Sequence, residues 1–281
     1  MPRTFYITDV FNEGPYSGNQ LATVADASGL STEEMQKIAR EFNFSETTFF
    51  MGRDSDGGFS VRIFTPTDEL PFAGHPTLGT AYLIREHIAP MDVDRIELNL
   101  KVGKIPVTFH KNGVLWMKQR SPEFGDILDR QIVADSLGLA LDELDEDFPS
   151  QFVSTGLEFA MIPLVSMDAL RRSAVRKSLG FGAFIFCRDG YNSDQSIAAR
   201  MYAGSAGISE DPATGSANGC LASYLVEHGY FDSSSIDIRV GQGYEINRPS
   251  TLHLRATKQD GEFDINVGGR VGLVAKGELF C

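Results

Sequence analysis

The sequence predicts an α+β protein made of two related halves. Most segments alternate apolar and polar residues as strands do, and only a few follow the 3.6-residue period of a helix. Three short segments in the first half recur in the second at separations of 138, 141 and 140 residues, about half of the 281-residue chain. These pairs are RIF at Arg62 with RMY at Arg200, Gly74-His75 with Gly215-Ser216, and RIELNL at Arg95 with SIDIRV at Ser235. A repeat at a fixed offset indicates duplicated architecture.

In the first half, residues 4–26 read as strand, turn and strand, interrupted by two glycine turns. Residues 30–44 predict a helix, because Ser31 and Glu34 have the spacing of a capping box. Residues 45–51 and 59–65 are rich in β-forming residues, and residues 75–87 predict a helix with Pro76 at its first position. A meander of three strands is expected over residues 95–119.

The second half shows a similar succession. Helices are expected over residues 126–139 and 216–229, the latter closed by Gly229. Strands are expected within four segments, which are residues 151–165, 182–189, 198–204 and 235–246. We therefore expect an N-terminal half over residues 1–118 and a C-terminal half over residues 119–281, with the last strand able to pair with the first half.

Composition excludes several classes of protein. The net charge of −13 disfavours binding to nucleic acid, which needs a basic surface. No apolar run is long enough to cross a membrane, and the N-terminus lacks the features of a signal peptide. Cys187, Cys220 and Cys281 are far apart, so they form neither a disulfide framework nor a zinc motif. We expect a cytoplasmic protein with no metal.

The repeated helix starts suggest a binding site. A helix N-terminus has unpaired N–H groups and partial positive charge, which favour carboxylate or phosphate. If the halves are related by a pseudo-two-fold axis, the two starts can face one another across a cleft. Small or hydroxylic residues there would let an anion approach the backbone, namely Gly74, Thr77, Thr214, Gly215 and Ser216. The nearby titratable residues are Glu46, Asp68, Glu69, His75, Glu210 and Asp211. A carboxylate base and a histidine beside a bound carboxylate suit proton abstraction.

Five motifs resemble the phenazine-biosynthesis isomerase-like (PhzF-like) family, within the diaminopimelate-epimerase fold. They occur in the family's order and span most of the chain. They are DVF…GPYSGNQLATV (Asp9–Val24), IAREFNFSETTF (Ile38–Phe49), RIFTPTDELPFAGHPTLGTA (Arg62–Ala81), VSTGLEF (Val153–Phe159) and GISEDPATGSANG (Gly207–Gly219).

The resemblance implies two similar halves, each a β-barrel-like sheet wrapped around a central helix, usually in a homodimer. It implies an isomerase or epimerase without cofactor that moves a proton on a small carboxylate-bearing metabolite. Glu46 matches the catalytic glutamate, which takes a proton from one carbon and returns one to another. His75 matches the motif histidine at the first helix start and is expected to take part in catalysis. Asp211 and Ser216 match the aspartate and serine of the second motif, which position the substrate and assist proton transfer. Gly74 and Gly215 match the glycines whose amides would bind substrate. We expect Asn19, Thr77 and Thr214 to take part in binding as well.

Other interpretations stay open at this point. Glu46 also fits an exposed carboxylate at a strand edge, Asp211 a turn residue before Pro212, and Asn19 a turn. A non-catalytic protein that binds small carboxylates is the alternative function.

Two further chemistries are disfavoured. His75 and Ser216 stand where two-thiol epimerases have cysteines, so racemisation by two thiols is not expected. Cys220 is expected in packed core. Thr214 stands where the nucleophile elbow of serine hydrolases requires glycine.

Overall fold

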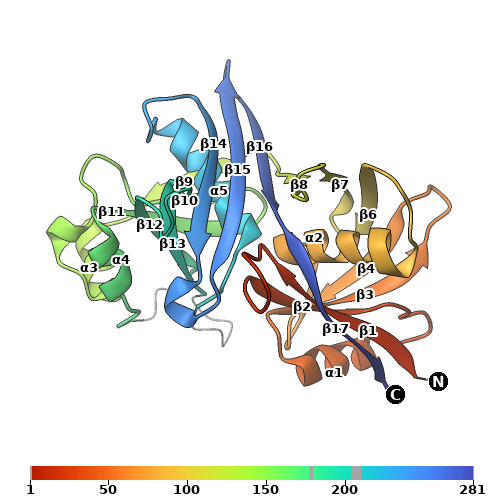
Figure 1. Ribbon diagram of the computed structural model, residues 1–281. Helices are drawn as coiled ribbons and strands as arrows, with labels where there is room; N and C mark the ends of the chain where they lie inside the picture. The colour runs from red at the N-terminus through yellow and green to blue at the C-terminus, as the bar shows by residue number, and fades with distance from the viewer. Residues whose placement is uncertain (1, 178–179, 204–209, 281) are drawn as a thin grey trace. The chain divides into compact units, whose positions relative to one another are not determined.

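The computed structural model describes residues 2–177, 180–203 and 210–280. Gly204, Gly207, Ile208, Ser209 and Cys281, which belong to segments discussed above, lie outside these residues. The chain forms two compact units, Met1–Lys118 with Gly268–Cys281, and Gln119–Val267 (Figure 1). The second unit ends before the C-terminus because the last strand, β17 (Val271–Leu279), pairs antiparallel with β1 (Arg3–Val10) of the first.

The first unit wraps a long series of strands around one helix. Its strands pair in the order β17, β1, β2, β3, β4, β6, β7 and β8, where β2–β3 and β4–β6 are parallel and the other pairs antiparallel. The short β5 pairs with β4. The strands not yet bounded are β2 (Asn19–Val24), β3 (Glu46–Arg53), β4 (Phe59–Phe64), β5 (Glu69–Leu70), β6 (Arg95–Leu100), β7 (Gly103–Phe109) and β8 (Leu115–Lys118).

Helix α2 (Gly74–Leu83) is the centre of this unit. It contacts β1, β2, β3, β6, β7, β8 and β17, and all its residues except Tyr82 are buried. A helix that is buried on all sides carries no polar stripe. Gly79 permits the close packing, because a Cβ there would lie 2.6 Å from Leu21 Cδ2 and 2.9 Å from Val10 Cγ2. The predicted central helix is therefore confirmed.

The start of α2 differs from the prediction. Gly74, not Pro76, is its first residue, so the proline stands at the third position. The helix can begin before the proline because the N–H groups of a first helical turn have no partners within the helix. Pro76, which has no N–H, therefore loses no hydrogen bond at the third position. The helix continues over Ile84–Ile88, most of which lies in the predicted range 75–87, but it does so as a π-helix, a form that the sequence did not predict.

Helix α1 (Thr32–Phe42) forms as the sequence predicts. The Ser31 side chain accepts from Glu34 N, and the Glu34 carboxylate accepts from Ser31 N. Both bonds of the capping box are present. Met35 and Ala39 of this helix pack into a cluster with Val24, Ala27, Phe49 and Phe64.

The second unit repeats the pairing of the first. Strands β9 to β15 pair in chain order. The pairs β11–β12 and β13–β14 are parallel, and the other pairs in this series are antiparallel. The buried helix α5 (Gly215–Glu227) contacts β10, β11, β14 and β15, as α2 contacts its own strands. The two related α+β halves are thus present. The strands are β9 (Glu123–Ile127), β10 (Gln151–Ser154), β11 (Glu158–Leu164), β12 (Ala183–Arg188), β13 (Ile197–Tyr202), β14 (Ser235–Gln242), β15 (Ser250–Gln259) and β16 (Glu262–Gly269), the last two residues of which are counted with the first unit.

Two shorter helices of this unit show where local patterns mislead. Residues 126–127, predicted helical, belong to β9, which is held by pairing with β10, and helix α3 (Arg130–Leu137) begins only after Asp129 caps it. Helix α4 (Met167–Arg172) was not predicted, although Ser166 caps it by accepting from Ala169 N. The 3-10 turns are η2 (Leu141–Glu143) and η3 (Tyr244–Ile246).

Candidate active site

Glu46 and His75 meet at the start of the central helix of the first unit. Glu46 is the first residue of β3, and His75 is the second residue of α2. Glu46 Oε2 lies 3.4 Å from His75 Nε2, and the two side chains are 17% and 5% exposed. The structure therefore pairs the two residues that the sequence proposes for proton transfer. A carboxyl and an imidazole at this distance can share a proton.

The His75 ring is neutral. Burial lowers the pKa of the imidazole from 6.5 to about 3, although a hydrogen bond with the Gln20 main chain acts in the opposite direction. Nε2 makes no hydrogen bond within the described residues, so Nδ1 is the nitrogen that bonds Gln20. The hydrogen bond with Gln20 raises the pKa of His75, so it favours the protonated ring. The ring is therefore the donor in this bond, from Nδ1–H to the Gln20 carbonyl. Nε2 then presents a lone pair to the Glu46 carboxyl.

We expect the His75 ring to keep its Nδ1–H tautomer between pH 5 and 8. Nitrogen chemical shifts of the imidazole check this, and a titration midpoint near pH 6.5 would contradict it. Since the pKa is lower in the folded state, the unfolded chain binds the proton first as pH falls. His75 therefore removes about 1.4 kcal/mol of stability per pH unit below 6.5 and down towards pH 3. A His75→Gln variant should lack this part of the acid slope.

Three further predicted residues belong to the first unit, on β2 and α2. Gly74, before His75, is buried, and as first residues of α2 both have main-chain N–H groups with no partner one turn earlier. Thr77 Oγ1 donates to Ala73 O at 2.7 Å, so its hydroxyl hydrogen is engaged within the helix. Asn19 is buried at the start of β2, directly before Gln20. The first helix start thus offers two amide donors.

The other predicted residues gather at the start of α5 in the second unit. Asp211 N donates to Met201 O, and its carboxylate accepts a short hydrogen bond from the Thr214 hydroxyl. Thr214 is the N-cap residue, Gly215 begins the helix, and Ser216 follows with 6% exposure. Asp211 is therefore fixed by both its main chain and its side chain.

Two residues of this helix start were missed. Gln242, at the end of β14, and Asn218, in the first turn of α5, are fully buried and hydrogen-bond to the Thr214 main chain. Gln242 follows Thr214 by 28 residues on a different element. No sequence spacing rule connects Gln242 with Thr214. The only available signal was a polar amide side chain within the predicted strand segment 235–246.

The repeat extends further than the three predicted pairs. Both helix starts read Glu-x-Pro-x-x-Gly, ending at Gly74 and Gly215. In each unit the glutamate forms a two-pronged ion pair with the arginine of the preceding strand. These pairs are Arg62 with Glu69 and Arg200 with Glu210. Both glutamates therefore hold the chain before the helix, and neither is a free base.

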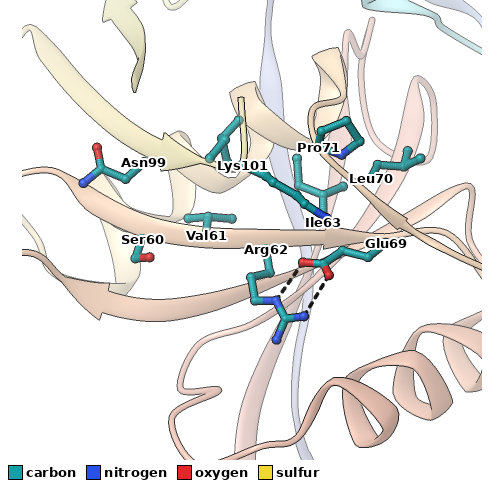
Figure 2. Close-up of a pocket in the computed structure, with 10 residues that line it drawn as sticks. Ser60, Val61, Arg62, Ile63, Glu69, Leu70, Pro71, Asn99 and Lys101 are labelled. Atoms are coloured by element: carbon teal, nitrogen blue, oxygen red, sulfur yellow. Dashed lines mark hydrogen bonds and ion pairs between the residues drawn. The ribbon is translucent and has the colours of Figure 1, made fainter. Parts of the chain in front are cut away.

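Figure 2 shows the Arg62–Glu69 pair at an open pocket of about 330 Å³ in the first unit. Neither Glu46 nor His75 lines it. Lys101 also lines the pocket, and its charge helps Arg62 to hold the pKa of the Glu69 carboxyl below its ordinary value. The pocket is thus distinct from the Glu46–His75 pair.

Three further features are relevant to function, namely the Cys220 thiol, clusters of metal-ligating side chains and membrane-spanning helices. Cys220 is buried as the sequence predicts, and burial raises the pKa of its thiol to about 12, so it stays protonated. The described residues contain no cluster of three metal-ligating side chains. None of the helices within the described ranges is both long and apolar enough to cross a membrane.

Comparisons with known proteins agree with this architecture. The family model described as "Phenazine biosynthesis-like protein" (PhzC-PhzF) matches residues 8–277. An uncharacterized isomerase of Clostridium acetobutylicum is 33% identical over 98% of this chain and 97% of its own. The trans-2,3-dihydro-3-hydroxyanthranilate isomerase of Pseudomonas aeruginosa is 32% identical over 98% of this chain and 99% of its own.

Solved structures support the same assignment. A PhzF-family phenazine biosynthesis protein of Bacillus anthracis superposes with a TM-score of 0.93 at 27% identity, covering 100% of both chains. A hydroxyproline epimerase of Agrobacterium vitis shares the fold alone, with a TM-score of 0.59 and 11% identity over 99% of this chain and 92% of that one. The chain therefore belongs to the phenazine biosynthesis-like (PhzC-PhzF) protein family and is an isomerase.

Proposed function

We propose that this isomerase moves a proton on a small carboxylate-bearing metabolite without a cofactor, with Glu46 as the acid and base. The observation that carries the proposal is the 3.4 Å approach of the Glu46 carboxyl to a neutral, buried His75 at the start of α2. A general base needs a nearby group that can stabilise or share its proton, and the Nε2 lone pair of His75 does so.

The reaction conserves atoms and electrons. The Glu46 carboxylate takes a proton from a carbon of the substrate, and the C–H electron pair moves into the system conjugated with the substrate carboxylate. The Glu46 carboxyl can exchange its hydrogen with water, and it then delivers a proton to a second position, either a carbon or a heteroatom. Glu46 is again a carboxylate. While Glu46 holds the proton, its O–H can donate to His75 Nε2. No oxidant or reductant is needed.

The helix starts supply the anion-binding groups. Gly74 and His75 in the first unit, and Gly215 and Ser216 in the second, have N–H groups at the positive ends of buried helices. Such donors stabilise a carboxylate and, more strongly, the charge that develops in its conjugated intermediate. Asp211 and Ser216 would position the substrate and assist proton transfer. The net charge of −13 does not prevent this, because the donors are local.

The named relatives provide the first compound to test, trans-2,3-dihydro-3-hydroxyanthranilate. This compound carries a carboxylate conjugated with a ring, as the mechanism requires. We expect turnover in heavy water to place deuterium on a carbon of the product. Mass spectrometry and NMR locate the label. Binding of this compound without turnover or deuterium exchange would instead favour a protein that only binds small carboxylates.

A further inference from the structure

The helix start of the second unit depends on one buried glutamine. Gln242 is the last residue of β14 and has no exposed surface. Its Nε2 donates to Asp211 O at 2.9 Å and to Thr214 Oγ1 at 3.2 Å. Its Oε1 accepts from Thr214 N at 3.3 Å and from Asn218 Nδ2 at 3.0 Å. All four hydrogen bonds go to the segment around the start of α5.

The hydrogen bonds from Gln242 Nε2 determine the donor direction in a short chain that runs from Gln242 through the Thr214 hydroxyl to the Asp211 carboxylate. Because Gln242 donates to Thr214 Oγ1, the single hydrogen of that hydroxyl is free to point to the Asp211 carboxylate, which accepts it. A second donation, to the carbonyl of Asp211, holds the main chain of the same residue. Gln242 thus orients Asp211 through two routes while touching only its main chain.

The bonds to Oε1 decide which amides of the helix start stay available. Gln242 accepts the N–H of Thr214, and Asn218 Nδ2 bonds both Gln242 and the Thr214 carbonyl. The N-cap residue is therefore held at its N–H, its carbonyl and its side chain. Gly215 and Ser216, the next two residues, keep the N–H groups that have no partner one turn earlier.

At the corresponding place of the first unit, the described part of the chain carries no such amide. The repeat that pairs Arg95 with Ser235 aligns Gln242 with Val102, two residues after the end of β6, and a valine side chain cannot hydrogen-bond. Leu100 and the following Lys101 line the open pocket of Figure 2. The glutamine is therefore a feature of the second helix start and not a requirement of the duplicated fold.

We propose that Gln242 is a positioning residue for the isomerase reaction, which holds Asp211 and the start of α5 in the arrangement that receives the substrate. This rests on the proposed roles of Asp211, Gly215 and Ser216. Its effect on the substrate is indirect and passes through Thr214 and Asp211.

The chain offers a matched control in Gln195. This glutamine is also buried in the second unit, and its Oε1 accepts two main-chain N–H groups while its Nε2 donates to two hydroxyls. The partners in these four bonds are Tyr191, Asn192, Tyr244 and Thr251, none of which belongs to the helix start. Replacing either glutamine by methionine keeps the approximate volume of the side chain and removes the four hydrogen bonds named for it.

With trans-2,3-dihydro-3-hydroxyanthranilate as substrate, we expect Gln242→Met to lower kcat at least tenfold, with a smaller rise in KM. Gln195→Met should leave both constants within twofold of wild type while lowering the melting temperature by a similar amount. A double-mutant cycle with Thr214→Val should be strongly non-additive, because both changes interrupt the same chain of donors. Equal kinetic effects of the two glutamine variants would overturn the proposal.

Amide hydrogen exchange tests the same positioning without a substrate. The Thr214 N–H bonds the Gln242 side chain, so its exchange should accelerate at least tenfold in Gln242→Met and stay unchanged in Gln195→Met. An unchanged Thr214 rate in Gln242→Met would overturn the proposal even if activity were lost. If wild type turns over no substrate, the proposed function fails, whereas a selective Thr214 response would still support Gln242 as the residue that holds this helix start.

Discussion

Glu46→Gln should lower kcat by about 10²–10⁴-fold, the range that a general acid or base contributes. The amide keeps the size of the side chain and can still donate to His75 Nε2, but it cannot take a proton from carbon. Affinity for trans-2,3-dihydro-3-hydroxyanthranilate should stay within a few-fold of wild type, because the helix-start amides are unchanged. Steady-state kinetics and calorimetric titration measure the two effects separately.

The matched control is Glu97→Gln, a carboxylate on β6 whose partner is Arg95. Its kcat should stay within twofold of wild type. Deuterium exchange into the substrate should disappear in Glu46→Gln and persist in Glu97→Gln. A Glu46→Gln enzyme that keeps more than a tenth of wild-type kcat would assign the proton transfer to another group.

Local patterns predicted those elements whose ends are determined by neighbouring residues. Ser31 and Glu34 predict the start of α1 because both partners of the capping box lie within one turn. Gly229, with φ of 62°, ends the region of α5 as expected. By contrast, residues 126–127 form a strand only because β10 lies beside them, and that pairing joins segments more than 20 residues apart. Sequence periodicity cannot detect such a contact.

The candidate site shows the same division. His75, Gly74 and Gly215 stand at helix starts that the repeat locates, so the place of each residue within its own unit follows from the sequence. Glu46 has no signature of its own in SETTFF, and only the family resemblance selects it. Its contact with His75 arises because β3 pairs in parallel with β2 and both strands pack against α2. Gln242 reaches its helix start through tertiary packing alone.

Arg200→Met should lower the free energy of unfolding by about 3–5 kcal/mol, the usual cost of leaving one member of a buried ion pair alone. Arg200 bonds both carboxylate oxygens of Glu210, and these side chains are 9% and 6% exposed. Its Nη1 also donates to main-chain carbonyls at the end of α4, namely those of Leu170, Arg171 and Ser173. The variant leaves a carboxylate and three carbonyls without this donor. Urea denaturation measures the loss.

The Arg62–Glu69 pair has the same geometry as Arg200–Glu210 but is less buried, so comparing the two shows which property determines their contribution to stability. Arg62 bonds Glu69 in the same two-pronged manner, but these side chains are 26% and 22% exposed. Arg62→Met should therefore cost only about 0–1 kcal/mol, as solvent-exposed pairs do. Changing Glu210 to methionine as well as Arg200 should restore part of the loss, because the uncompensated charge disappears. Equal losses for the two arginine variants would mean that the bidentate geometry, and not burial, determines the stability of these pairs. Burial predicts a difference because a charge inside the unit has no water to replace its lost partner.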